Sequence, residues 1–298
     1  MMVAPRLVVV TRRSEYELLV REHGTANQAR FVLAERGRSF AALERLHAAN
    51  EDAVATVLSG APKAWRRVRI DREDLTSFLF EPGDVVACVG QDGVVANAAR
   101  YVGEHYVLGV NPDPASYEGV LVRLSPAAAR ERVEAAAARA VPVERRTMAA
   151  AMLDDGRAIA ALNDIFIGHR SHQSARYSLK AGDREERQSS SGVVIATGAG
   201  ATGWALSIDR ERREPLELPK PTDAALAFFV REAWPGRGFG ASITAGRVAA
   251  GATLEVRSEM PDSGVIFADG IEAGYLEFPW GSSAGVAVAA RTLNLVAA

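Results

Sequence analysis

The first part of the chain alternates short apolar runs with stretches of helical spacing, and this alternation constrains the fold more than any other feature. Leu7–Val10, Val85–Val89 and Tyr106–Val110 are valine-rich runs of four or five residues, which suit strands buried on both faces. Helix-like segments separate them. Strands that alternate with helices in this way are typical of a parallel α/β sheet, and we predict one here.

Capping residues and helix breakers mark the segments between these runs. Ser14, Thr25 and Ser39 are residue types that cap helix N-termini well, and Gly37 is a typical stop. We predict helices over residues 14–21, 25–37, 71–80 and 94–102, a further helix from 39 through 54, and a half-exposed strand over 65–70.

The residue pattern changes in the second part of the chain. An alanine-rich helix over Pro126–Ala140, closed by Pro142, is interpreted as the hinge between two domains. Beyond Thr147, short apolar segments are separated by Gly, Ser, Asp and Pro turns, which predicts an antiparallel β-rich domain. The expected strands are 158–162, 165–168, 175–179, 193–197, 253–258 and 265–268.

These patterns predict two domains. The α/β domain covers residues 1–145 and the β-rich domain covers 146–278. The tail, 279–298, contains the apolar segment Val286–Val296, which we expect to return to the first domain as a strand.

Composition limits the partners and the compartment. The formal net charge is −2, so no global positive field attracts nucleic acid or an anionic membrane, and any phosphate-binding ability is local. Cys88 is the only cysteine, and it lies inside an apolar run, where a buried core residue is expected. A chain without a disulfide framework, a long apolar span or a signal-peptide pattern is expected in the cytoplasm.

Three glycine-containing loops are candidates for chemistry. The loop Gly90-Gln91-Asp92-Gly93 lies between a buried strand and a helix, where glycine lets backbone amides approach a ligand and the helix N-terminus favours anions. The loop 197–204 follows a strand and matches G-x-G-x-x-G. The third is Asp269-Gly270. Each loop taken alone has an ordinary reading as a turn, because Asp-Gly and Gly-rich segments are common turn sequences.

Other catalytic patterns are weaker. A Rossmann dehydrogenase needs a crossover helix after the G-x-G-x-x-G loop, and there is little room for one before Pro215. No Walker A lysine follows the loop, so a P-loop enzyme is not expected. His169 and His172 lack the further ligands that a metal site needs. Arg66, Arg67 and Arg69 are interpreted as a solvated strand face with a possible phosphate contact.

Taken in order, the motifs resemble the NAD kinase family over nearly the whole chain. The family has a Gly-Gly-Asp-Gly loop, then a Val-Asn segment, an Asn-Glu or Asn-Asp pair, a Ser/Thr/Gly-rich loop ending in an aromatic residue, and a late Asp-Gly. The corresponding segments here are Gly90–Gly93, Gly109–Asp113, Ala161–Asp164, Thr197–Ser207 and Asp269-Gly270. Gln91 stands where the family has a glycine, and Trp204 stands where it has a tyrosine.

The resemblance implies an N-terminal α/β domain, a C-terminal β-sandwich and a crevice between them that holds a dinucleotide. It implies ATP-dependent phosphorylation of the adenosine ribose 2′-hydroxyl of NAD to give NADP, with Mg²⁺ accompanying ATP and a homodimer or homotetramer as the assembly. Asp92 is then the catalytic base. The residues implied in ligand binding are Gly90, Gln91, Gly93, Asn111, Asn163, Asp164, Thr202, Gly203, Trp204 and Ser207.

This assignment agrees with elementary chemistry. Phosphoryl transfer depends on positioning and on neutralisation of phosphate charge. An ordinary carboxylate is ionised at neutral pH and can accept the hydroxyl proton. Two alternatives remain open: a non-catalytic NAD(P)-binding protein of the same fold, and a related kinase with a different hydroxyl acceptor.

Overall fold

The computed structural model describes residues 5–298, which form two compact units. Unit 1 contains the chain up to Glu144 together with Asn294–Ala298, and unit 2 contains Arg145–Leu293. Each unit has its own core. The fold is the predicted combination of a parallel α/β region and an antiparallel β-rich region.

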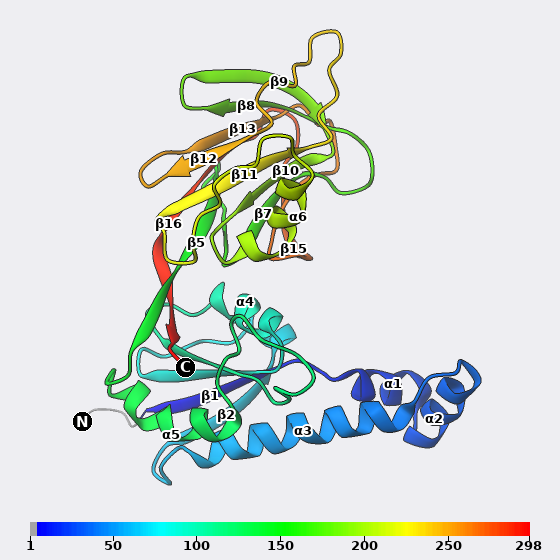
Figure 1. Ribbon diagram of the computed structural model, residues 1–298, viewed down its shortest axis with the longest axis vertical. Helices are drawn as coiled ribbons and strands as arrows, with labels where there is room; N and C mark the ends of the chain where they lie inside the picture. Colours follow the sequence, from blue (N-terminus) through cyan, green and yellow to red (C-terminus); the bar gives the residue numbers. More distant parts are fainter. Residues whose placement is uncertain (1–4) are drawn as a thin grey trace. The chain divides into compact units, whose positions relative to one another are not determined.

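Unit 1 is built on a parallel sheet with the strand order β2-β1-β3-β4 (Figure 1). The last residues of β16 (Ser283–Val296) add Asn294 and Leu295 beside β4, also in parallel. The other strands are β1 (Arg6–Thr11), β2 (Arg66–Asp71), β3 (Asp84–Val89) and β4 (Tyr106–Val110). Every residue of β1 and β3 is buried, because helices cover both faces of this sheet.

Helices α3 (Phe40–Ser59) and α5 (Pro126–Ala137) cover one face and α4 (Asp92–Ala99) covers the other (Figure 1). Side chains of α3 and α5, such as Val57 and Val133, pack on alternate residues of the strands, such as Val9 and Val85. α4 buries five of its eight residues. The helix predicted as a hinge, α5, is therefore part of the core of unit 1.

Two short helices, α1 (Glu15–His23) and α2 (Ala26–Glu35), pack on the N-terminal part of α3 around Leu33 and Phe40. Ser14 begins α1 with a capping box that includes Glu17. Because α1 follows β1 directly, it starts at the carboxyl end of that strand. No helix within residues 5–298 has the length and apolarity needed to cross a membrane.

The predicted helix over residues 71–80 is wrong. Only a 3₁₀ turn forms, η1 (Arg72–Asp74), and the chain then runs irregularly to β3. Phe78 packs edge-to-face against Phe80 with 4.9 Å between ring centroids, and the Arg6 guanidinium lies 5.0 Å from the Phe78 ring. These tertiary contacts hold Phe78 beside Arg6 of β1 and Phe80 against Phe78, and they outweigh the local helical preference.

Unit 2 contains two antiparallel sheets. One has the order β12-β11-β10-β7-β14-β15, and the other contains β16-β13-β8-β9 and the hairpin β5-β6. The strands are β5 (Val143–Leu153), β6 (Ala158–Ala161), β7 (Asp164–His169), β8 (Ala175–Ala181), β9 (Arg184–Ser190), β10 (Gly192–Ala196), β11 (Ala225–Arg231), β12 (Ala245–Ala249), β13 (Leu254–Ser258), β14 (Gly264–Ala268) and β15 (Ile271–Glu277).

The two sheets of unit 2 enclose one apolar core. Alternate residues point into it, among them Ile165 and Ile167 of β7 and Leu254 and Val256 of β13. Tyr177 is fully buried there, and its hydroxyl lies 2.6 Å from the Ser190 hydroxyl. Unit 2 is therefore a β-sandwich. A short helix, α6 (Trp204–Arg210), packs on the outer face of the β10-β11 sheet.

At the amino ends of β1 and β3, a buried ion pair joins Arg6 to Asp84. Arg6 donates through Nε at 2.8 Å and through Nη2 at 2.5 Å, and Nη2 also donates to the Leu79 carbonyl at 2.9 Å. Asp84 accepts a further bond from the Glu81 backbone N–H. The Asp84 hydrogen bond raises the pKa of Arg6, and the polar groups at this edge satisfy one another.

We expect Asp84→Ala to lower the free energy of unfolding by about 3–5 kcal/mol, because it leaves a buried guanidinium without its partner. Urea unfolding measures the loss. The control is Glu44→Ala, which breaks the exposed Arg30–Glu44 pair and should cost less than about 1 kcal/mol. Equal effects of the two substitutions would contradict the structural role of the buried pair.

Candidate functional site

The carboxyl edge of the unit 1 sheet gathers residues from four strands. In the register of the sheet, Thr11 of β1 lies beside Asp71 of β2, and equivalent pairings join β1 to β3 and β3 to β4. The residues that follow the strand ends therefore form a row. From β2 to β4 the row is Arg72, Arg12, Gly90 and Asn111. The order of strands changes direction between β1 and β3, because β2 is added on one side of β1 and β3 and β4 are added on the other. Ligands of open α/β sheets bind at such a switch point.

The loop from Gly90 to Gly93 turns the chain from β3 into α4. Gly90 has φ 139°, a conformation that other residues rarely adopt, so a glycine is required there. Gln91 has φ −89° and ψ 166°, which is ordinary extended backbone. The glutamine in place of the family's glycine is therefore accommodated without backbone strain.

Asp92 is the first residue of α4, and its carboxylate holds a remote loop. It accepts hydrogen bonds from the backbone N–H groups of Val120, Leu121 and Val122 at 3.0, 2.8 and 3.0 Å. The carboxylate therefore fixes residues 120–122 beside the start of the helix. Sequence reasoning expected Asp92 to face a ligand, and this second role in the loop was not foreseen.

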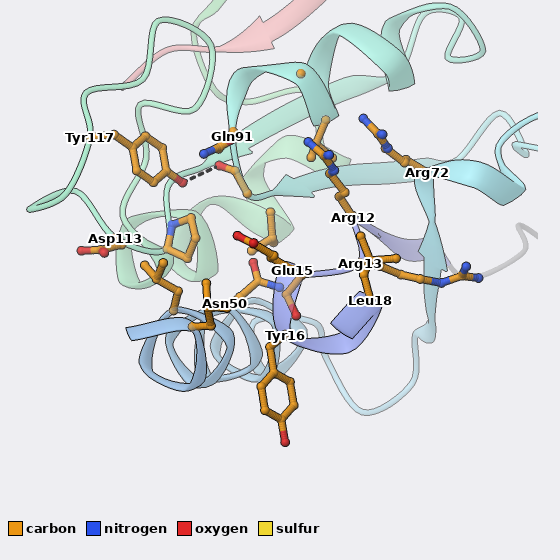
Figure 2. A pocket seen from close by; sticks show the side chains of 18 residues that line it. Arg12, Arg13, Glu15, Tyr16, Leu18, Asn50, Arg72, Gln91, Asp113 and Tyr117 are labelled. Carbon is orange, nitrogen blue, oxygen red and sulfur yellow. Dashed lines mark hydrogen bonds between the residues drawn. The ribbon is translucent and has the colours of Figure 1, made fainter. Parts of the chain in front are cut away.

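The segment after β4 closes over the glycine loop. The buried Asn111 amide donates to the Tyr117 carbonyl at 3.0 Å and its oxygen accepts from the Asp113 N–H at 2.9 Å. The Tyr117 hydroxyl then donates to the Gly90 carbonyl at 3.0 Å (Figure 2). Burial, together with the charges of Asp113 and Asp92, raises the pKa of Tyr117 to about 12, so this hydroxyl remains a donor at neutral pH.

A pocket of about 430 Å³ opens at this edge of the sheet (Figure 2). Its walls come from the end of β1, the starts of α1 and α4, one side of α3, and residues 112–117. Gly90, Gln91 and Gly93 line it, whereas the Asp92 carboxylate turns toward residues 120–122. A volume of this size is in the range of pockets that bind small ligands.

In unit 2, strand register brings three separate motifs to one end of a sheet. β10 ends at Ala196 opposite Asp164 of β7, and β14 ends at Ala268 opposite Ile165. The turns that follow or precede these strand ends therefore meet. They are the segments 161–164, 197–204 and 269–270, which the sequence singled out separately.

Asp269 ties two of these motifs together. It begins the two-residue turn between β14 and β15 with φ 55°, and Gly270 follows with φ 67°, as in a type I′ hairpin turn. Its carboxylate accepts hydrogen bonds from the backbone N–H groups of Leu162, Asn163 and Asp164, at 3.1, 2.6 and 3.3 Å. The turn therefore also fixes the backbone of the Asn163-Asp164 segment.

The glycine-rich loop packs on the same segment. The Thr197 N–H donates to the Asn163 carbonyl at 2.9 Å, and its hydroxyl donates to the Leu162 carbonyl at 2.5 Å. A side chain at Gly200 would lie 2.1 Å from the Asn163 carbonyl oxygen, so only glycine permits this close approach.

The end of the loop presents an aromatic ring and two hydroxyl groups. Trp204 stacks on Phe166 with 5.9 Å between ring centroids, and the Arg231 guanidinium lies 5.2 Å from the Trp204 ring. Thr202 is exposed and its hydroxyl donates to the Ala199 carbonyl. Gly203 precedes α6, and Ser207 is exposed on that helix.

Asn163 and Asp164 retain unused hydrogen-bonding capacity. Within residues 5–298, neither the Asn163 amide nor the Asp164 carboxylate has a hydrogen-bond partner, although Asp164 is 9% exposed. Burial raises the pKa of Asp164 to about 6. Burial also raises the pKa of Asp269 to about 7, and the nearby charge of Asp164 adds to this rise. Buried polar groups without partners are typical of a ligand-binding site.

Several residues of these two regions were not anticipated. Arg12, Arg72 and Tyr117 line the pocket in unit 1, and Phe166 supports Trp204 in unit 2. Arg12 and Arg72 could have been predicted as site residues, because each directly follows a strand. Arg66 and Arg69 instead pair with Glu81 and Glu51, and Arg67 donates to the Ala61 carbonyl.

Comparison with known proteins identifies the fold. The structure is similar to that of yeast NADH kinase complexed with NADH, with a TM-score of 0.60 and 14% sequence identity, over 100% of this chain and 84% of the yeast chain. Unit 1 and unit 2 thus have the two-domain fold of that kinase. No protein-family model matches the chain.

The sequence matches are to proteins named NAD kinase. The human protein named NAD kinase 2, mitochondrial, is 26% identical over 263 residues, covering 71% of this chain and 60% of the human protein. An NAD kinase from Methylococcus capsulatus is 31% identical over 138 residues, covering 43% of this chain and 46% of that protein. The chain is similar to members of the NAD kinase family, and the resemblance inferred from its motifs is confirmed. It spans only about 60% of the length of its human relative.

The raised pKa of Asp164 predicts a pH-dependent stability. A carboxyl whose folded pKa is about 6, against an ordinary 3.8, binds its proton more tightly in the folded state, so stability falls as the pH rises from 4 through 6. Asp164→Asn keeps the shape and removes the charge. From pH 5 to pH 8 we expect the free energy of unfolding of Asp164→Asn to fall by about 1–2 kcal/mol less than that of wild type.

Urea unfolding at both pH values measures this difference. The exposed Asp262 provides the matched control, because Asp262→Asn makes the same substitution in solvent and should leave the pH dependence unchanged. An Asp164→Asn variant with the wild-type pH dependence would show that Asp164 does not titrate in this range.

Proposed function

We propose that the protein transfers the γ-phosphoryl group of ATP to the adenosine ribose 2′-hydroxyl of NAD, giving NADP. The observation that carries the proposal is the meeting of three family motifs in unit 2, where the Asn163 amide and the Asp164 carboxylate are left without partners among residues 5–298. The relatives named NAD kinase and the likeness to a structure of NADH kinase with NADH support it.

Unit 2 supplies groups suited to a dinucleotide. An amide such as Asn163 can both donate to and accept from a base, and the Asp164 carboxylate can accept hydrogen bonds from ribose hydroxyls. The Trp204 ring, with Thr202 and Ser207 close in sequence, offers a flat apolar surface and two hydroxyl groups. The backbone of residues 162–164 is held by Asp269, so these groups are positioned before a ligand binds.

Unit 1 supplies groups suited to the phosphoryl donor and to proton transfer. In the reaction a bond forms between the 2′-oxygen and the γ-phosphorus, and the bond from that phosphorus to the β,γ-bridging oxygen breaks, releasing ADP. We assign the hydroxyl proton to Asp92. A carboxylate has about four acceptor sites, and the three backbone N–H groups of residues 120–122 leave one for this proton.

The residues that line the unit 1 pocket are suited to contact a Mg²⁺ ion that is bound together with ATP. Within residues 5–298 no group of three or more His, Cys, Asp or Glu residues could hold a metal by itself. Mg²⁺ usually keeps several water molecules and binds one or two carboxylates together with substrate phosphates. Asp113 lines the pocket and is the carboxylate that would contact it. When bound, the ion neutralises charge on the donor phosphates.

Compartment and assembly follow from the same proposal. The single cysteine, Cys88, is buried and its pKa is raised by burial, so the chain needs no oxidising compartment and we propose a cytoplasmic location. We propose a homodimer or homotetramer, as the family resemblance implies. Light scattering coupled to size-exclusion chromatography distinguishes these assemblies from a monomer.

The direct test combines the protein with NAD, ATP and Mg²⁺ and detects NADP with an NADP-specific dehydrogenase. We expect NADP to form in wild type, and we expect Asp92→Asn to lower kcat by about 10²–10⁴-fold while NAD affinity changes only a few-fold. Glu118→Gln is the matched control, since it changes an exposed acid to an amide on the same loop.

The outcomes separate the alternatives. Binding of NAD without NADP formation would support a non-catalytic dinucleotide-binding protein. Consumption of ATP with a different acceptor would support a related kinase. Near-wild-type turnover of Asp92→Asn would remove Asp92 from proton transfer and leave it only its role in holding residues 120–122.

Gln91 provides a second test, because its side chain lines the pocket and its backbone needs no glycine. We propose that the Gln91 amide donates a hydrogen bond to a donor phosphate. Gln91→Gly should then raise the KM for ATP by about tenfold or more and lower kcat, with the KM for NAD unchanged. A lower KM for ATP in steady-state kinetics would show that the glutamine crowds the donor instead.

A further inference from the structure

Three aromatic rings form a row on the outer face of the unit 2 sheet that contains β7, β10 and β14. Phe166 of β7 contacts the other two, with its ring centroid 4.8 Å from that of Phe267 and 5.9 Å from that of Trp204. Both neighbouring rings are stacked on it, with interplanar angles of 28° and 19°. Asp164 precedes Phe166 by two residues on β7, so both side chains point to the same face. The row therefore begins beside a carboxylate that we assign to the dinucleotide.

Glycines of the sheet leave the space that the central ring occupies. A Cβ atom at Gly168 would lie 2.4 Å from the Phe166 ring, and one at Gly192 would lie 2.6 Å from it. Both distances are too short for a contact between carbon atoms, so the ring can lie over these positions only because neither carries a side chain. Phe166 is buried in this arrangement, whereas Trp204 and Phe267 remain partly exposed. The row thus presents aromatic surface to a ligand.

A positive charge lies at the far end of this row. Arg231 is the last residue of β11 and the register partner of Gly192, whereas Asp164 is the register partner of Ala196. Since directly opposed residues of antiparallel strands share a face, Arg231 and Asp164 lie on one face at opposite ends of β10. The Arg231 guanidinium lies 5.2 Å from the centroid of the Trp204 ring.

The charge of Arg231 is only partly balanced. The Glu232 carboxylate accepts a hydrogen bond from Arg231 Nη2 at 2.9 Å, but the Glu232 side chain is 60% exposed, and exposed ion pairs are weak. Glu232 also has φ 44°, which is uncommon for a residue other than glycine. The guanidinium therefore retains a positive field that acts on a ligand beside the indole.

The two redox forms of the dinucleotide differ in one charge. The nicotinamide ring of NAD carries a formal positive charge and the dihydronicotinamide ring of NADH carries none, while the adenosine and the pyrophosphate are the same in both. A fixed charge beside the nicotinamide ring therefore changes the relative affinity for the two forms. A charge elsewhere in the site changes both affinities alike. Because like charges repel, a guanidinium beside this ring disfavours NAD.

We propose that Arg231 is a specificity determinant that shifts the acceptor preference from NAD toward NADH, with the nicotinamide ring bound against the aromatic row beside Trp204. This inference rests on the proposed kinase function and adds to it the choice between the two redox forms. Glu232 opposes the shift, because it neutralises part of the guanidinium charge. Asp164, at the other end of the row, attracts a positive ring, and its contribution is the same in every variant tested here.

Competition between the two dinucleotides measures this preference. The full chain is incubated with Mg-ATP and an equimolar mixture of NAD and NADH, and the NADP and NADPH formed are separated by anion-exchange chromatography. The product ratio gives the ratio of kcat/KM for NAD to kcat/KM for NADH. We expect Arg231→Gln to raise this ratio by about three- to tenfold, and Arg231→Lys, which keeps the charge, to stay within about twofold of wild type.

A second substitution should move the ratio the other way. Glu232→Gln removes the partial balance of the Arg231 charge and should lower the ratio by about two- to threefold. A general disturbance of the fold would not shift the ratio in opposite directions, so the two variants isolate an electrostatic role. Arg257→Gln is the matched control, since it removes an equal charge from an exposed position on β13 of the other sheet and should leave the ratio unchanged.

The outcomes separate this inference from the proposed function. An unchanged ratio in Arg231→Gln, with NADP and NADPH still formed, would overturn the role of Arg231 and leave the kinase function standing. Equal changes in both kcat/KM values would place another part of the dinucleotide against the row and would also overturn it.

If wild type forms neither product, the proposed function is wrong. Isothermal titration calorimetry with NAD and with NADH then tests Arg231 without catalysis. A rise in the affinity for NAD relative to NADH in Arg231→Gln would support the inference, and an unchanged ratio of dissociation constants, or no binding of either dinucleotide to wild type, would overturn it.

Discussion

One interaction, used once in each unit, holds the loops on which both candidate sites depend. An aspartate followed by glycine accepts hydrogen bonds from three consecutive backbone N–H groups of a remote segment. In unit 1 Asp92 holds residues 120–122, and in unit 2 Asp269 holds residues 162–164. A hydrogen bond to a charged group stabilises by about 1.5–3 kcal/mol, so each aspartate, when ionised, contributes substantially to the loop that it holds. Gly270, with φ 67°, permits the tight turn after Asp269, whereas Gly93 lies within the first turn of α4.

The two edges of the unit 1 sheet show how a fold separates stability from function. At the amino edge, Arg6 and Asp84 satisfy each other and also bind nearby backbone groups. At the carboxyl edge, Arg12 and Arg72 lie together without such neutralisation by the described residues, beside a pocket. Unit 2 has a similar contrast, since the Asp269 carboxylate accepts three backbone hydrogen bonds while the carboxylate of the adjacent Asp164 accepts none from residues 5–298. The charged groups without partners among the described residues, Arg12, Arg72 and Asp164, are available to bind a ligand.

Many elements with strong local signals could be predicted from the sequence, whereas strands that form mainly by pairing could not. The valine-rich strands β1, β3 and β4 and the capped helices α1 and α2 are found close to their predicted positions. The strands β5, β9, β11, β12 and β15 were not predicted. The residues of β9 are mostly charged, and this strand forms by pairing with β8 across Gly182, which has φ 61°. The expected helix over 71–80 failed because Phe78 and Phe80 pack on tertiary neighbours.

The sequence by itself determined the alternation of strand and helix, the change to β structure, and the order of the motifs that indicates the family. These are properties of spacing and residue type, and they are readable without distances. Only the tertiary structure decided which motifs meet, because antiparallel register in unit 2 joins segments more than a hundred residues apart. It also decided that Asp92 holds a loop and that Arg12 and Arg72 form a pair. Parallel register places residues of different strands in one row, and no sequence interval encodes that row.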